Sequence, residues 1–154
     1  MSNQASMSPT RRYEVDVMAY ARNLGLAVYS AELPEGVSGM LLKEPAYGSK
    51  SGFVIFTEAR EPAVRQRFTA AHEIGHFELH KELIGSGVSE NYLLRSDGLS
   101  SRIEVEANRF AADLLMPFDK IDLAMSEGIT SPKDLARAFN VSEIAMAIRL
   151  GIPT

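Results

Sequence analysis

The residues best suited to chemistry lie together in His72-Glu73-Ile74-Gly75-His76, which fits the pattern H-E-x-x-H. Residues four apart share one face of a helix, so both imidazoles can reach one zinc ion while Glu73 faces a water molecule at the same site. Zinc lowers the pKa of such a water toward neutrality, and a neighbouring carboxylate can take its proton during attack on a carbonyl. The spacing therefore predicts one Zn²⁺ per chain, held by His72 and His76, with Glu73 as the general base of a hydrolytic reaction.

A catalytic zinc site needs a third protein ligand. The chain has no cysteine and only one further histidine, so a carboxylate is the natural choice. Arg102, Glu106, Arg109 and Asp113 recur at helical spacing as one charged stripe, which is typical of a solvated helix face. We therefore expect Glu106 to face water. Glu104 lies at the border of the apolar stripe on the same helix, and we predict that it is the third ligand.

Two neighbouring positions have alternative interpretations. Ser101-Arg102-Ile103-Glu104 also fits the capping box S-x-x-E, in which Glu104 would bind the backbone at a helix start instead of a metal. Asn108 lies one turn after Glu104 and could hydrogen-bond a ligating histidine and select its tautomer. The alternative for Asn108 is an ordinary polar border residue.

His80 lies four residues beyond His76, but the first and third histidines of such a series are separated by about 12 Å along the helix axis. That separation is too large for His72 and His80 to bind the same metal ion, so we expect His80 to make a structural hydrogen bond near the site. Tyr92 and Arg95 are weak candidates for contacts to a substrate carbonyl, with a plain surface role as the alternative. The ligand set also accepts other divalent ions, although zinc is the first choice.

Periodicity and turn residues predict a mostly helical α+β fold with a small, mostly antiparallel three-stranded sheet. The charge-poor, glycine-rich residues 85–101 are expected to form a mobile loop. We expect helices over residues 12–24, 62–83, 101–116, 118–127, 132–139 and 143–150, and strands over residues 26–29, 39–42 and 53–56.

The composition of the 154-residue chain is that of one globular domain, expected over residues 13–154 after a flexible tail at 1–12. The absence of cysteine and of any long apolar run predicts a soluble, cytoplasmic protein. The net charge of −4 gives no general attraction to nucleic acid.

The stretches RQRFTAAHEIGHFELH (residues 65–80) and ExxANxFAADLLMP (residues 104–117) together resemble the ImmA/IrrE family of metallopeptidases. The resemblance implies a zincin-like fold, zinc ligation by His72, His76 and Glu104, and catalysis by Glu73. It also implies a cytoplasmic metallo-endopeptidase that cleaves and inactivates a helix-turn-helix repressor or an antitoxin-like partner.

The C-terminal part, within residues 118–150, has a helix-turn-helix outline: Pro132 to Phe139, a turn at Asn140, and a helix that follows Ser142. The sequence EIAMAI at residues 143–148 is acidic and then apolar, so we expect this helix to be buried and not to read DNA. Two further functions remain open: a catalytically silent module that sequesters a repressor, and, more weakly, a DNA-binding regulator. A module without catalysis has no chemical need for Glu73, which favours the enzyme.

Overall fold

A computed structural model of the chain describes residues 12–83 and 97–153. The chain divides into two compact units. The larger unit comprises Val17–Ala111, and the smaller unit comprises Ala112–Thr154 together with the N-terminal residues up to Asp16. The tail expected at residues 1–12 lies outside the described residues except for Arg12.

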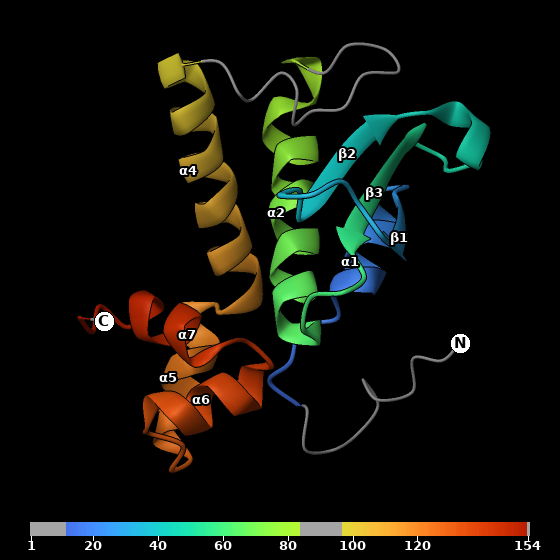
Figure 1. Cartoon of the computed structure of the whole chain (residues 1–154). Coiled ribbons are helices and arrows are strands. Elements are labelled where there is room, and N and C mark those ends of the chain that lie inside the picture. Colours follow the sequence, from blue (N-terminus) through green and yellow to red (C-terminus); the bar gives the residue numbers. More distant parts are fainter. Residues whose placement is uncertain (1–11, 84–96, 154) are drawn as a thin grey trace. The chain divides into compact units, whose positions relative to one another are not determined.

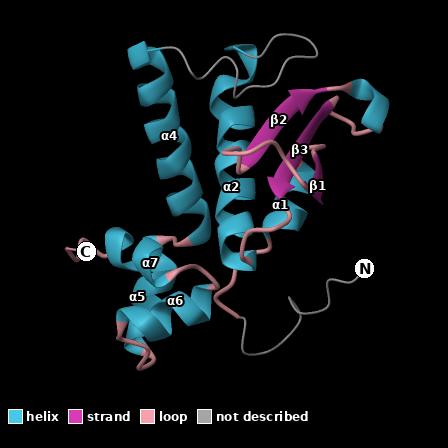
Figure 2. Cartoon of the chain, viewed as in Figure 1, coloured by secondary structure: helices cyan, strands magenta, loops and turns pink. Residues whose placement is uncertain are grey.

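The larger unit contains the predicted three-stranded sheet, with strands β1 (Ala27–Ala31), β2 (Gly39–Lys43) and β3 (Phe53–Glu58) (Figures 1 and 2). The strand order is β1-β3-β2. β2 pairs with β3 in antiparallel fashion, but β1 pairs with β3 in parallel. The predicted mostly helical α+β fold with a small three-stranded sheet is therefore confirmed, and the sheet is mixed because one of its two strand pairs is parallel.

The central position of β3 explains its composition. The sequence FVIFTE has almost no polar alternation, and Val54 and Ile55 are both fully buried. A strand that is covered on both faces has this kind of continuous apolar run. Strand direction, by contrast, leaves no trace in the apolar pattern, so the parallel pairing could not be read from it.

Helix α2 (Ala63–His80) is the central helix of the larger unit and contacts strands β2 and β3. It is followed by a 3-10 turn, η4 (Lys81–Leu83), and preceded in the chain by helix α1 (Val17–Asn23), which starts later than expected. Its residues Ala71 and Ile74 are fully buried and join Leu41 in the core. Each large apolar side chain buried in this way stabilises the fold by about 1.5–3 kcal/mol.

Helix α4 (Asp97–Leu115) runs beside α2 on the side away from the sheet (Figure 1). It begins four residues before Ser101, so Ser101 lies inside the helix and cannot be its N-cap. The capping-box interpretation of Glu104 is therefore wrong. The segment expected to be a loop at residues 85–101 is helical from Asp97 onward, and its remainder lies outside the described residues.

The smaller unit contains helices α5 (Phe118–Ser126), α6 (Pro132–Phe139) and α7 (Glu143–Arg149), close to their predicted ranges. The Ser131 and Ser142 hydroxyls accept hydrogen bonds from the backbone of the first turns of α6 and α7. Asn140 ends α6 in the left-handed conformation with φ 57°. These caps are the local reason for the helix-turn-helix outline.

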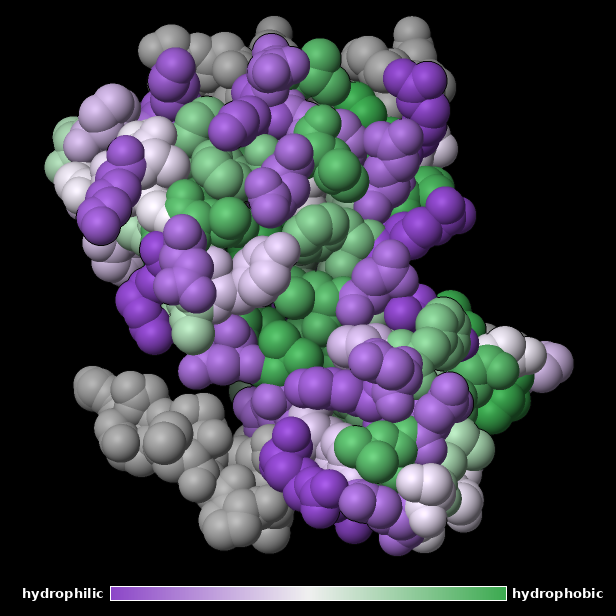
Figure 3. Space-filling view, turned by 180° about the vertical axis from the view of Figure 1, so that it is seen from behind, coloured by the Kyte–Doolittle hydropathy of each residue, from purple (hydrophilic) through white to green (hydrophobic). Residues whose placement is uncertain are grey.

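Helix α7 is less buried than expected. Met146 is fully buried, but Ile144 and Ile148 are each 65% exposed. Apolar residues reach the surface of this unit as they do elsewhere on the molecule (Figure 3). The expectation of a fully buried helix was wrong, because the apolar run EIAMAI covers more than one helix face.

Arg149 in the same unit is held by contacts within it. The guanidinium lies 3.8 Å from the centre of the Phe118 ring, pairs with Asp113 at 3.0 Å and donates to the Met116 carbonyl at 2.8 Å. This cation therefore serves packing. Among residues 12–83 and 97–153, no helix combines the length and the apolar character needed to cross a membrane.

Candidate metal centre

The three histidines of the chain lie on one face of α2, because they follow one another at intervals of four residues. His76 is fully buried, His80 is nearly so, and the side chain of His72 is 16% exposed. The exposure of His72 opens the cluster to solvent at one end. The buried neighbours Ile74 and Phe77 anchor the helix in the core and hold this face in position.

Glu104 from α4 completes a three-residue group with His72 and His76. Its Oε1 atom lies 2.7 Å from His72 Nε2 and 3.5 Å from His76 Nε2. The two Nε2 atoms are 3.1 Å apart. Each of the three residues therefore directs one ligand atom toward the same small region, and these atoms all lie within 4.8 Å of one another.

This group fits a zinc ion in both chemistry and size. Two imidazoles and a carboxylate are a common ligand set for zinc with an open coordination position. Bonds of about 2.0–2.2 Å in a tetrahedral site place ligand atoms about 3.3 Å apart, close to the separations between Nε2 and Oε1 atoms here. Burial lowers the pKa of His76, an effect that the neighbouring His72 and His80 reinforce and Glu104 opposes. A neutral imidazole is the form that binds a metal.

Glu104 is ionised over the whole neutral range. Partial burial raises its pKa, but the close contacts with the His72 and His76 imidazoles outweigh this effect and lower the pKa to about 2. The carboxylate therefore carries the negative charge that a divalent cation requires.

Asn108 lies one turn after Glu104 and contacts His72. Its Oδ1 atom is 2.8 Å from His72 Nδ1. An amide oxygen only accepts, so this nitrogen donates and Nε2 is the nitrogen that faces Glu104. The contact orients the imidazole toward the group of ligand atoms.

The packing of α2 on α4 sets the distance between the histidines and Glu104. A Cβ atom at Gly75, inside the motif, would lie 3.0 Å from Phe110 Cβ and 3.1 Å from Phe110 Cγ. These separations are shorter than an ordinary carbon contact of about 3.5–4.0 Å. Gly75 is therefore the residue that allows α4 to approach closely enough for Glu104 to reach both histidines.

Glu73 lies on the sheet side of the motif. It is 3% exposed, and its Oε2 atom would be 3.0 Å from a Cβ atom at Gly39, the first residue of β2. The same Cβ atom would clash with Thr69 Cγ2. Gly39 thus allows β2 to pass directly over the carboxylate.

A cleft of about 420 Å³ opens beside this group. Residues 36–39 form one wall, and α2 contributes Arg65 and Thr69 beside His72 and Glu73. Glu104 and Asn108 line the cleft from α4. An extended segment of a substrate in this cleft would have access to both the ligand atoms and Glu73.

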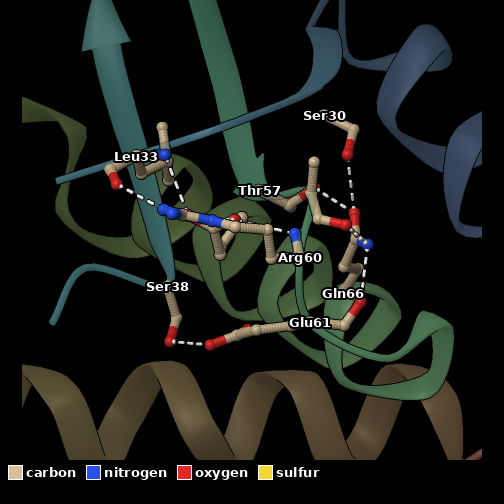
Figure 4. A network of polar contacts seen from close by, with 9 residues as sticks. Ser30, Leu33, Ser38, Thr57, Arg60, Glu61 and Gln66 are labelled. Carbon is tan, nitrogen blue, oxygen red and sulfur yellow. Dashed lines mark hydrogen bonds and ion pairs between the residues drawn. The ribbon is translucent and has the colours of Figure 1, made fainter. Parts of the chain in front are cut away.

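A polar network fixes the connection between β1 and β2 that forms this wall (Figure 4). Glu58, at the end of β3, accepts hydrogen bonds from the Leu33 backbone at 2.8 Å and from the Arg60 guanidinium at 2.8 Å. Arg60 also donates to the Leu33 carbonyl at 2.9 Å, and Glu61 accepts from the Ser38 hydroxyl at 2.8 Å. Both ends of the connection are therefore tied to the segment between β3 and α2.

Three further residues were considered in the sequence: Tyr92, Arg95 and Glu106. Tyr92 and Arg95 lie outside the described residues. Glu106 is half-exposed, but its Oε1 atom lies 2.7 Å from His80 Nε2, so the expectation that it simply faces water was wrong. Pattern analysis missed this pairing, together with Gly39 and the Glu58 network, because each of them depends on a residue that a different helix, strand or loop supplies.

Residues 21–151 match the sequence model of the IrrE N-terminal-like domain, a peptidase family. The chain belongs to this family. The resemblance to ImmA/IrrE proteins that residues 65–80 and 104–117 indicated is thereby confirmed.

Individual relatives are more distant. The immunity region protein 2 of Bacillus phage phi105 is 29% identical over 109 residues, which cover 64% of this chain and 65% of the relative. A transcriptional regulator of Mycobacterium tuberculosis has a similar fold, with a TM-score of 0.60 at 17% identity over 88% of this chain and 40% of that one. The chain thus spans less than two thirds of the length of either protein.

Proposed function

We propose that the chain is a zinc-dependent metallo-endopeptidase that cleaves a helix-turn-helix repressor or an antitoxin-like partner. The observation that carries this proposal is the convergence of His72 Nε2, His76 Nε2 and Glu104 on one point beside the buried carboxylate of Glu73. Membership of a peptidase family supports the same chemistry.

Each residue has a definite role in this proposal. His72, His76 and Glu104 would hold the ion, and zinc would supply Lewis acidity for water and for the substrate carbonyl. Glu73 would accept the proton of the attacking water and return it to the leaving amine. The cleft wall at residues 36–39 and the exposed Arg65 would orient the peptide along the site.

The choice of substrate rests on the relatives. One relative is named for the immunity region of a phage, and the family resemblance implies cleavage of a repressor. We infer that this substrate is a separate protein of the cytoplasm. DNA binding by the C-terminal unit is the less favoured role, because its described residues form no evident phosphate-binding surface. The described part of the unit has Lys133 and Arg137 exposed, and Arg149 is held by Phe118 and Asp113.

The test compares wild type with Glu73→Gln in cells of the natural host. Glu73→Gln should retain zinc and lose cleavage, because the amide cannot accept a proton. Mass spectrometry of protein N-termini should reveal a new terminus in a regulatory protein with wild type only. Glu78→Gln, an exposed position of the same helix, is the matched control and should cleave normally.

The alternative is a catalytically silent module that sequesters the repressor. In that case Glu73→Gln and wild type would both release the repressed genes, and no new N-terminus would appear. Persistence of the transcriptional effect in Glu73→Gln would therefore exclude hydrolysis as the function.

A further inference from the structure

A chain of hydrogen-bonded groups leads from the metal centre to His80 and Glu106, which do not line the cleft. His76 Nδ1 lies 3.0 Å from His80 Nδ1, and His80 Nε2 lies 2.7 Å from Glu106 Oε1. His76 and His80 are buried, whereas Glu106 is half-exposed on α4. The series therefore connects a predicted metal ligand to a carboxylate on the neighbouring helix.

The chemistry of the outer group sets the direction of every hydrogen bond in the series. An ionised carboxylate only accepts, so His80 Nε2 carries the hydrogen in the contact with Glu106. In a neutral His80, Nδ1 is then the acceptor, and His76 Nδ1 must donate to it. His76 therefore presents the lone pair of Nε2, which is the atom that lies beside His72 Nε2 and Glu104.

Without this series, the buried His76 ring could adopt the other tautomer or turn about its Cβ–Cγ bond. Its Nδ1 atom lies in the protein interior, where a donor without an acceptor is strongly unfavourable.

We propose that His80 and Glu106 are positioning residues that hold the ligand His76 in its zinc-binding tautomer and orientation. This inference rests on the proposed zinc site. It gives Glu106 a supporting role at the site in place of that of a solvated surface charge. Helix α4 would then contribute two residues, Glu104 as a ligand and Glu106 through its contact with His80.

The experiment measures zinc affinity by competition with a chromophoric chelator, so it requires no substrate. The variants are Glu106→Leu, His80→Leu, the double variant of both, and Glu106→Gln. Glu78→Leu serves as the control for loss of one exposed carboxylate near the site. Thermal melts of the metal-free proteins establish that each variant is folded.

Glu106→Leu and His80→Leu should each weaken zinc binding by about 10- to 100-fold, the usual loss when the partner of a ligating histidine is removed. The double variant should be no weaker than His80→Leu, because Glu106 acts only through His80. Glu106→Gln should retain most of the affinity, since its amide oxygen can still accept from His80. Glu78→Leu should bind zinc like wild type.

Two results would overturn the inference while leaving the zinc site intact: wild-type affinity in a folded Glu106→Leu, or losses that simply add in the double variant. Nitrogen-15 spectra of the zinc-loaded wild type provide an independent check, since the chain has only three histidines. Hydrogen on His80 Nδ1 would contradict the proposed direction of the series. Failure of the wild type to bind zinc would instead refute the proposed function.

Discussion

Substitution of Gly75 by alanine should change the free energy of unfolding only slightly but weaken zinc binding, because it alters the geometry of the metal site. The added Cβ would lie 3.0, 3.1 and 3.2 Å from Phe110 Cβ, Cγ and Cδ1. Ordinary carbon contacts need about 3.5–4.0 Å. Helices α2 and α4 must therefore move apart by about 0.5 Å, or the Phe110 ring must leave its position.

The two effects on stability have opposite signs. Alanine is favoured over glycine inside a helix by about 1 kcal/mol, whereas overpacking of a packed interface costs about 1–3 kcal/mol. The net loss in the free energy of unfolding should therefore lie between about 0 and 2 kcal/mol. Glu104 moves with α4, and a site of this kind tolerates displacements of only about 0.5 Å. Zinc affinity should fall by about tenfold or more, as when a ligand loses its supporting contacts.

Urea denaturation in the presence of EDTA gives the first quantity, and chelator competition gives the second. Phe110→Ala in the Gly75→Ala background removes the Cγ and Cδ1 atoms of two of the three close contacts. This second change should lower stability further yet restore part of the zinc affinity. If Gly75→Ala binds zinc as tightly as wild type, or if the double variant binds more weakly still, the spacing of α2 and α4 does not set the site.

Three further predictions follow from the same contacts. Gly39→Ala should abolish peptidase activity with little loss of bound zinc, because the three atoms nearest to the new Cβ belong to Thr69 and Glu73. Parallel loss of zinc in elemental analysis would contradict this. Glu104→Ala should lose zinc in the same analysis, whereas Glu106→Ala should weaken binding without abolishing it. Glu58→Gln should remove a pH-dependent part of the stability: the hydrogen bond from Arg60, followed by those from the Leu33 and Arg60 backbone, lowers the pKa of Glu58 from 4.5 to about 2. This stabilisation is present above pH 4.5 and is lost as the pH falls toward 2. The urea midpoints of wild type and Glu58→Gln should therefore converge in acid, and a difference between them that does not change with pH would contradict the lowered pKa.

Sequence reasoning located the centre of the site because its constraints are local. The spacing of His72 and His76 and the apolar residues between them depend on one helix only. The choice of Glu104 over Glu106 as the residue beside both histidines also came from one helix, since periodicity gives the direction in which each side chain points.

The parts that sequence reasoning missed depend on two elements at once. The direction of the Glu106 side chain was predicted from its own helix, but its hydrogen-bond partner, His80, lies on α2. The close approach of β2 at Gly39 likewise requires knowledge of Thr69 and Glu73 opposite. The parallel pairing of β1 with β3 leaves no mark in either strand. Contacts between different helices and strands are therefore the features that the sequence pattern does not predict.

The strand order has a consequence for how the protein comes into being. β3 is the last of the three described strands in sequence order yet lies between the other two, so β1 and β2 have no partner in this sheet until Phe53–Glu58 has been synthesised. Residues 36–39 consequently obtain a fixed place only when the ribosome reaches the segment that leads into α2. The cleft wall and the helix that bears the histidines are therefore both completed only after β3 has been synthesised, and a nascent chain that ends before β3 has neither.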